Sequence, residues 1–230
     1  MTKNESEADA RRADGSVSTE ERGALLRVRL ERPARRNALT RGMLERLGEI
    51  FASVEARRDL RAVVLSGAGA DFCAGADDSE LGASDAARRV REVCAGVELC
   101  GTPVIAAVRG AAAGAGGELA LACHLRVAST DARLGELGAE EAFRLGLVNR
   151  VVEPARLIEE TESLAQAVID NAAPLAARAC LQAVTRGAHL PFDEALRLEA
   201  ELFARLFATA DVREGTRAFL EKRKPSFRGQ

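Results

Sequence analysis

A run of very small residues near the middle of the chain constrains the fold more than any other segment. The apolar segment 102–108 is typical of a buried strand, and the chain continues as Gly110-Ala-Ala-Ala-Gly-Ala-Gly-Gly before an apolar helix with one acid, Glu118. Small residues let a ligand approach the backbone closely, and the start of a helix leaves N–H groups without partners. We therefore expect a site here that stabilises an oxyanion and moves a proton.

A second segment has the same organisation. The apolar stretch 61–66 predicts another buried strand, and it runs into the small residues of Gly67-Ala-Gly-Ala-Asp-Phe-Cys-Ala-Gly-Ala-Asp77. Because each of these two strands ends in small residues, we expect two backbone N–H groups to converge on one oxygen atom.

Four segments carry a family resemblance, and they occur in the family's order along the chain. They are Arg32-Pro-Ala-Arg-Arg-Asn-Ala-Leu39, Asp71-Phe-Cys-Ala-Gly-Ala-Asp77, Gly114-Ala-Gly-Gly-Glu-Leu-Ala-Leu-Ala-Cys123 and Leu145-Gly-Leu-Val-Asn-Arg-Val-Val152. Together they resemble the enoyl-CoA hydratase/isomerase (crotonase) superfamily, over residues 25–227. The resemblance implies an α/β fold with a crotonase-like (ββα)n spiral core and a C-terminal helical region.

The domain organisation follows from composition and from this resemblance. Residues 1–22 are polar and acidic at their start, and we expect a disordered tail there. Residues 23–153 are expected to form the crotonase-like core, and residues 154–230 the helical region. Apolar periodicity and capping residues predict the individual elements. The expected strands are 25–30, 62–66, 102–108, 125–128 and 148–153, and the expected helices are 41–58, 84–100, 157–171, 175–186, 192–207 and 212–222.

Composition excludes several classes of partner. The formal charge is −2, Trp and Tyr are absent, and no apolar run approaches the length of a membrane helix. We therefore expect no nucleic acid and no membrane among the partners. The five cysteines include no Cys-x-x-Cys pair and the start of the chain has no secretory signal, so we expect a cytoplasmic protein. His124 has no companion ligands and is expected to be structural, and no metal site is predicted.

The resemblance implies three catalytic groups. The backbone N–H groups of Ala76 and Ala115 correspond to the two donors that bind a thioester oxygen, and Glu118 corresponds to the first of two catalytic acids in the hydratases. It also implies contacts with coenzyme A along the chain. These involve Ala34, Arg35, Ala74, Gly75, Asp77, Phe219 and Lys222. The alternative for Arg35 is a solvated basic turn.

The resemblance implies the partners as well. A coenzyme A thioester, or an acyl-carrier thioester, is the expected substrate, and no permanently bound cofactor is expected. The family forms trimers and hexamers, so we expect a homo-oligomer. Phe219 and Lys222 can then contact the coenzyme A of a neighbouring subunit.

The chain departs from the family near residues 135–140. By the resemblance, the position of the second catalytic acid falls on Gly138, and we expect that a family segment of a few dozen residues is absent there. Glu136, Glu140 and Glu141 are nearby acids, and we expect them to be solvated side chains near a helix start. A hydratase-like reaction is the leading hypothesis. The alternatives are an enoyl-CoA isomerase, an acyl-thioester decarboxylase, or a non-catalytic crotonase-fold subunit that supports a partner enzyme.

Overall fold

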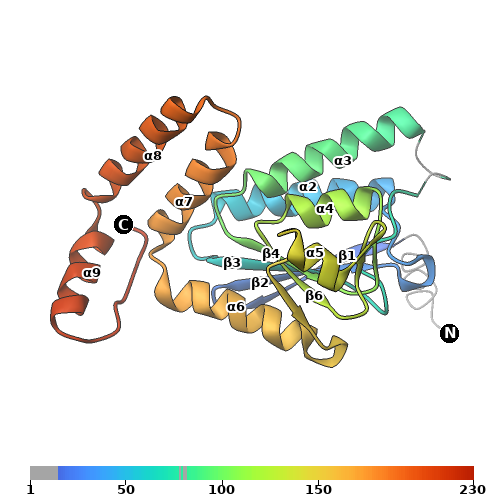
Figure 1. Ribbon diagram of the computed structural model, residues 1–230, viewed down its shortest axis with the longest axis horizontal. Coiled ribbons are helices and arrows are strands. Elements are labelled where there is room, and N and C mark those ends of the chain that lie inside the picture. Colours follow the sequence, from blue (N-terminus) through green and yellow to red (C-terminus); the bar gives the residue numbers. More distant parts are fainter. Residues whose placement is uncertain (1–14, 78, 80–81) are drawn as a thin grey trace, which may run out of the picture.

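A parallel sheet forms the centre of the molecule. The computed structural model describes residues 15–77, 79 and 82–230. Within that part of the chain the main sheet has six strands, which lie side by side in chain order (Figure 1). They are β1 (Ser16–Arg22), β2 (Leu25–Glu31), β3 (Ala62–Gly67), β4 (Val104–Val108), β6 (Leu125–Ser129) and β9 (Arg150–Val152). All pairs from β2 to β9 are parallel, and β1 pairs antiparallel with β2.

The helices cover the two faces of this sheet unequally. Because the strand order never reverses, right-handed crossovers place successive connecting helices on the same face. Figure 1 shows these helices together on one side of the sheet, and α6 on the other. Their bounds are α2 (Arg41–Ala56), α3 (Ala83–Glu98), α4 (Ala115–Ala122) and α6 (Leu157–Asn171).

Strand β3 is covered on both faces, which explains its uninterrupted apolar sequence. Val63 and Leu65 belong to the core beneath α2, α3 and α4, whereas Ala62 and Val64 belong to the core beneath α6. Successive side chains of a strand point to opposite faces, so a strand that is covered on both faces needs apolar residues at every position.

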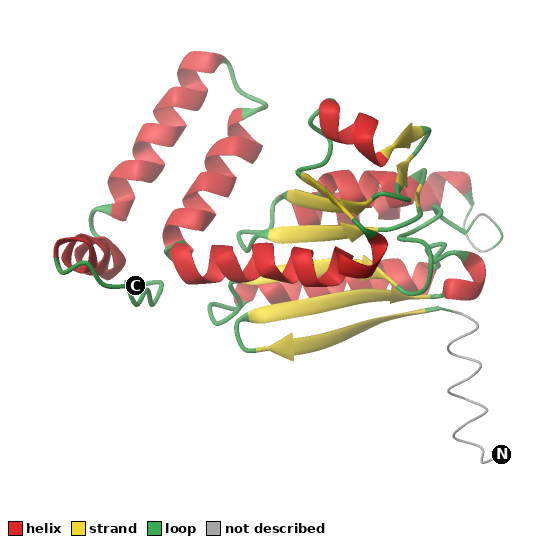
Figure 2. Cartoon of the chain, turned by 60° about the horizontal axis from the view of Figure 1, so that its bottom comes forward, coloured by secondary structure: helices red, strands yellow, loops and turns green. Residues whose placement is uncertain are grey.

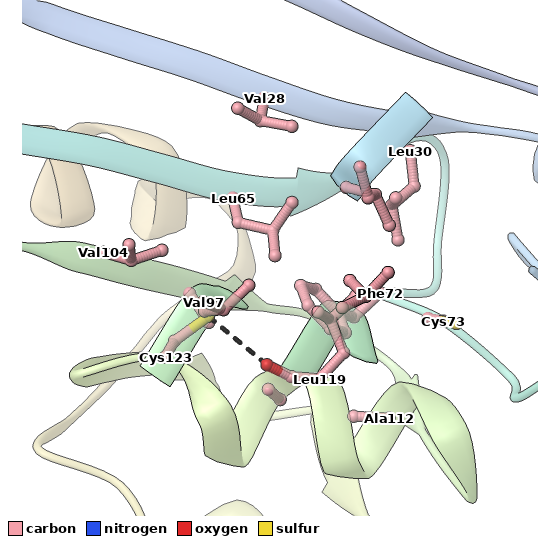
Figure 3. Close-up of a cluster of buried hydrophobic side chains, with 14 of the residues drawn as sticks. Val28, Leu30, Leu65, Phe72, Cys73, Val97, Val104, Ala112, Leu119 and Cys123 are labelled. Carbon is pink, nitrogen blue, oxygen red and sulfur yellow. Dashed lines mark hydrogen bonds between the residues drawn. The ribbon is translucent and has the colours of Figure 1, made fainter. Parts of the chain in front are cut away.

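The first of these cores also supports the loops that follow the strands. Leu65 from β3, Phe72 from the loop after β3 and Leu119 from α4 are all buried in it, and they lie together in Figure 3. The thiol of Cys123 donates to the carbonyl oxygen of Leu119 at 3.3 Å. The two small-residue segments therefore rest on a packed apolar base.

A second, smaller sheet lies beside the start of α4. It consists of β5 (Ala111–Ala112), β7 (Arg133–Leu134) and β8 (Leu137–Gly138). β7 and β8 form a hairpin in which Leu134 pairs with Leu137. The two-residue turn needs a left-handed first residue, which Gly135 provides with φ of 58°. The short helix α5 (Ala139–Arg144) follows directly.

The C-terminal helices α7, α8 and α9 extend away from the sheet at one end of the molecule (Figures 1 and 2). α7 (Pro174–Gly187) and α8 (Phe192–Leu206) pack against each other, yet neither contains a buried residue. α9 (Ala210–Leu220) follows them. Large apolar side chains are exposed along this region: Val184, Leu190, Phe192, Leu196, Phe203, Phe207, Phe219 and Leu220. No helix in the described part of the chain is long and apolar enough to cross a membrane.

Most of the expected elements are present. Thr40 and Thr209 cap α2 and α9 as expected, each accepting a backbone N–H three residues later. The tail expected over residues 1–22 is wrong for Ser16–Arg22, which forms β1, because its backbone pairs along the whole of β2. Residues 1–14 lie outside the described part. The boundary expected at residue 154 does not end the packed core either, because Leu157 and Ala165 of α6 are buried against the sheet.

His124 ties three elements together in its neutral form. Its Nδ1 accepts the N–H of Val104 at 2.9 Å, so the ring proton is on Nε2, which lies 3.2 Å from the carbonyl oxygen of Glu98. Burial lowers the pKa of this imidazole below its ordinary value of 6.5. These contacts agree with the structural role expected for His124.

The stability of the protein should therefore depend on pH through His124. The folded state resists protonation of this ring. The contribution of the neutral ring to the free energy of unfolding is therefore complete above about pH 6.5 and is lost as the pH falls toward the lowered pKa. In urea unfolding between pH 7 and pH 5, the wild type should lose more stability than His124→Asn, which keeps an acceptor for Val104. His189→Asn, at an exposed histidine, is the control, and its free energy of unfolding should change with pH as that of the wild type does. The same pH dependence of unfolding free energy in all three proteins would contradict this assignment.

Candidate active site

The two small-residue segments pair with each other at the carboxyl ends of β3 and β4. The N–H of Cys73 donates to Ala111 O at 2.9 Å, and the N–H of Ala113 donates to Cys73 O at 3.0 Å. This is a short parallel bridge between Cys73 and Ala112. We call residues 67–77 the first loop and residues 109–115 the second loop. Backbone hydrogen bonds, rather than side chains, hold the two loops together at this point.

Ala76 presents a free N–H group in the first loop. The loop runs beside Leu39, whose N–H donates to Gly75 O at 2.8 Å and whose carbonyl accepts from Asp77 N at 2.9 Å. In a parallel bridge of this kind, the residue between the two bonded neighbours turns its own N–H away from the partner. Accordingly, the N–H of Ala76 has no acceptor among the residues that the structure describes.

Ala115 presents the second free N–H group, because it is the first residue of α4. The opening N–H groups of a helix have no intrahelical acceptor, and that of Ala115 has none elsewhere in the described chain. Gly114 precedes it with φ of 49°, and the Cα of Gly75 lies 4.0 Å from where a β-carbon of Gly114 would be. The start of α4 therefore lies against the first loop, and it adds the positive end of a helix dipole there.

Gly116 allows this close approach. A β-carbon at residue 116 would lie 2.1 Å from Cys73 O and 2.7 Å from the carbonyl carbon of the same residue. Both atoms are backbone atoms and cannot rotate away, so any side chain here would push α4 from the first loop. The small residue is therefore needed for the spacing between the loops.

Glu118 lies in the first turn of α4, and its side chain is exposed. Its own N–H donates to Gly114 O, so the backbone of the turn is regular. On the side of α3, the half-buried thiol of Cys94 is close enough to respond to this carboxylate. Burial, with Glu118 and Glu98 adding to it, raises the pKa of Cys94 to about 11. The acid therefore follows the free N–H of Ala115 by three residues, on the first turn of α4.

Asp77 ends the first loop, and it is engaged within the protein. Its carboxylate accepts from Ser79 and from Arg32 Nη1, the latter at 2.5 Å with both side chains buried. These hydrogen bonds lower the pKa of Asp77 to about 2. Ala34 and Arg35 lie in the 3-10 turn η1 (Pro33–Arg35), directly after Arg32. Arg36, directly after η1, accepts the N–H of Ala74 at 2.9 Å, so the structure brings η1 and the first loop together.

Phe219 and Lys222 lie far from the other expected residues. Phe219 is on α9 and is 83% exposed, and Lys222 follows that helix. Figure 1 shows α9 at one end of the molecule, well away from α4. A single chain therefore does not bring these two residues to Glu118.

The region of the expected second acid is a tight hairpin. Gly138 ends β8, and it is paired with Arg133. The Glu136 side chain is fully exposed in the turn, and Glu140 and Glu141 lie in the exposed first turn of α5. The exposure of these three acids agrees with their expected surface roles.

Asn37 is a site-supporting residue that the sequence analysis did not single out. It is completely buried, its Oδ1 accepts from Arg32 N, and its Nδ2 donates to Ala68 O and Asp71 O. It adopts φ of 56°, which asparagine tolerates better than most residues. An uncharged polar residue inside a basic turn was the available signal.

Comparisons with known proteins identify the family. The family model for enoyl-CoA hydratase/isomerase matches residues 20–136 and 134–230. This chain belongs to the enoyl-CoA hydratase/isomerase family. A short-chain-enoyl-CoA hydratase of Clostridium acetobutylicum is 33% identical over 251 aligned positions, which cover 91% of this chain and 96% of that protein. A crotonyl-CoA hydratase of Syntrophomonas wolfei is 32% identical, with 92% of this chain and 96% of that protein covered.

Solved structures agree with this membership. An enoyl-CoA hydratase from Bacillus anthracis has a TM-score of 0.87 at 28% identity, and the match covers 94% of this chain and 100% of that chain. An enoyl-CoA hydratase subunit from Geobacillus kaustophilus has a TM-score of 0.81 at 36% identity, covering 94% and 98% respectively. The crotonase-like α/β fold with a helical C-terminal region is thereby confirmed.

The contact at Gly116 predicts the effect of a single methyl group. Gly116→Ala should lower the free energy of unfolding by about 1–3 kcal/mol, because the added carbon collides with the Cys73 carbonyl group. Gly48→Ala, at an exposed position of α2 with open space around it, should be neutral or stabilise by up to about 1 kcal/mol. Urea unfolding of both variants measures the difference. A Gly116→Ala protein as stable as Gly48→Ala would show that the loops are not in tight contact.

Proposed function

We propose that this protein adds water to the double bond of a 2-enoyl-CoA thioester. The observation that carries the proposal is the pair of unpartnered N–H groups at Ala76 and Ala115, with the acid Glu118 in the same first turn of α4 as Ala115. Membership in the enoyl-CoA hydratase/isomerase family supports it, as do the hydratases among the relatives.

The two N–H groups bind the thioester carbonyl oxygen. They stabilise the negative charge that this oxygen gains when water adds to the β-carbon, and the helix dipole of α4 contributes in the same sense. Loss of one such donor typically raises a barrier by about 2.7–4 kcal/mol. The backbone donors are already held in place by Leu39, Cys73 and Gly116, so they need no rearrangement during the reaction.

Glu118 moves the proton. It accepts a proton from water as the water oxygen bonds to the β-carbon, and the enolate forms on the thioester. It then returns that proton to the α-carbon, so that one H and one OH have been added and the carboxylate is restored. One carboxyl group is sufficient for this sequence, and no resident cofactor is needed.

Coenzyme A is proposed to bind along η1 and the first loop. Ala34 and Arg35 contact its adenine and phosphate end, and Arg35 supplies a guanidinium group suited to phosphate oxygens. Ala74 and Gly75 line the path of the pantetheine arm. Asp77 acts through its buried pair with Arg32, which positions η1, because its carboxylate is already occupied.

We further propose that the chain lacks a family segment at the hairpin of β7 and β8. The family model matches in two parts that meet at residues 134–136. An alignment of 251 positions is also longer than the 230 residues of the chain, so the relative contributes residues that have no counterpart here. The position of the second catalytic acid falls on Gly138, at the edge of this absent segment.

Substitution of the acid tests the proposed reaction. Glu118→Gln keeps the size of the side chain but cannot accept the proton, so kcat/KM for hydration of crotonyl-CoA should fall by about 10²–10⁴-fold. Glu140→Gln changes an exposed acid on α5 in the same way and should keep wild-type activity. Loss of absorbance at the conjugated double bond measures the rate.

The same assay separates the alternative functions. Full activity in Glu118→Gln would remove the role proposed for this acid. A folded wild type without hydration activity would instead favour an isomerase, a decarboxylase or a non-catalytic partner subunit.

We propose that the protein is a cytoplasmic homo-oligomer, a trimer or a hexamer. The exposed apolar side chains of α7, α8 and α9 support an interface there, since monomers rarely expose so much contiguous apolar surface. Phe219 and Lys222 would then reach the coenzyme A of a neighbouring subunit. The free cysteines among the described residues agree with a reducing compartment.

Light scattering after size-exclusion chromatography tests this assembly. The wild type should have three or six times the mass of one chain. Phe203→Asp, on the exposed face of α8, should yield smaller species because a charge would be buried in the interface. Leu99→Asp changes a similarly exposed residue at the end of α3 and should leave the mass unchanged. A monomeric wild type would contradict the proposal.

A further inference from the structure

The side chain of Asp71 connects the two loops that carry the free N–H groups. Its Oδ1 accepts the backbone N–H of Ala111 at 2.7 Å. Asp71 belongs to the first loop, five residues before Ala76, and Ala111 belongs to the second loop, four residues before Ala115. The side chain is only 17% exposed. A carboxylate therefore bridges the two loops, next to the backbone bridge at Cys73.

Arg36 holds this carboxylate in place. Its Nε lies 2.9 Å from Oδ2 of Asp71, and its Nη2 lies 3.2 Å from Oδ1. The arginine follows η1, so it brings a third segment to the same carboxylate. Such a two-point contact restricts the orientation of both groups. The guanidinium group and the Ala111 N–H lower the pKa of Asp71, so the carboxylate stays ionised at neutral pH.

The backbone around Asp71 is fixed as well. Its carbonyl oxygen accepts from Asn37 Nδ2 at 2.8 Å. On the opposite side, a β-carbon at Gly110 would lie 2.7 Å from Oδ1 of Asp71 and 2.2 Å from Ala70 O. Gly110 also has φ of 53°, so a side chain there would be strained in addition. The second loop thus leaves the space that the carboxylate occupies.

We propose that Asp71 is a positioning residue that sets the separation between the Ala76 and Ala115 donors, with Arg36 orienting its carboxylate. This inference rests on the proposed function, because it assumes that both donors bind one thioester oxygen. Asp71 does not touch that oxygen; it acts through the backbone of the two loops. Errors of about 1 Å in such a geometry cost on the order of 100-fold in rate.

Two variants at Asp71 and one control test the proposal. Asp71→Ala removes the bridge, and we expect kcat for crotonyl-CoA to fall by about 10–100-fold, with KM changed by less than about threefold. Asp71→Asn keeps one oxygen that can accept from Ala111, so its loss should be smaller. Asp59→Ala removes another arginine-paired aspartate, on the loop before β3, and should leave kcat unchanged.

A spectroscopic measurement separates positioning from a general loss of structure. Two donors that polarise a thioester carbonyl shift the absorbance of a bound aryl-conjugated enoyl-CoA to longer wavelength. The shift should be largest in the wild type and the Asp59→Ala control, smaller in Asp71→Asn, and smallest in Asp71→Ala. Urea unfolding of each protein establishes whether the variants are folded. If Asp71→Ala does not fold, the comparison of Asp71→Asn with the wild type provides the test.

Each outcome bears on the inference. Wild-type kcat and absorbance shift in both Asp71 variants would overturn it, and so would a rise in KM alone. A wild type that shifts the absorbance without hydrating crotonyl-CoA would overturn the hydratase proposal, while the graded loss of the shift would still support the role of Asp71. A wild type that binds the ligand with no shift would overturn both.

Discussion

The close pairing of the two small-residue loops is the contact on which the rest of the site depends. Cys73 exchanges backbone hydrogen bonds with Ala111 and Ala113, and Gly116 lets the first turn of α4 pack directly against the carbonyl group of Cys73. Without this contact, the free N–H of Ala76 and that of Ala115 would belong to two unrelated loops. With it, the two loops form one hydrogen-bonded frame, and fixed donors of this kind are what stabilisation of a developing charge requires.

The frame is held from below by the core and from the side by polar contacts. Phe72 and Leu119 anchor the loop and the helix in one apolar cluster. Asn37 and the Arg32–Asp77 pair join the first loop to η1. Buried polar groups of this kind are stable only when their partners are present, so η1 and the first loop adopt their conformations together. The proposed coenzyme A surface and the oxyanion site are thus one unit.

The hairpin of β7 and β8 supports the second loop from the side. It pairs with β5 on the side away from Cys73, and Gly135 N donates to Ala112 O. The second loop is therefore paired with a strand on this side. That strand, β7, is joined to β8 by a turn of only two residues. Glu118 is exposed, and the proposed chemistry relies on one carboxyl group. Apolar side chains on α7, α8 and α9 are also left exposed in a single chain.

The sequence by itself determined the local elements and the types of chemical group. The uninterrupted apolar run of β3 and the caps at Thr40 and Thr209 are among the local signals that predicted most helices and most strands, since each depends on neighbours within a few residues. The small residues after two strands predicted a pair of backbone donors, which the family resemblance assigned to Ala76 and Ala115. Only the tertiary structure decided that β1 pairs with β2, that Asn37 and Asp71 join segments more than 30 residues apart, and that Phe219 lies away from Glu118. These outcomes depend on which surfaces meet after the chain has folded back, and polar residues in loops have no periodicity from which such contacts can be predicted.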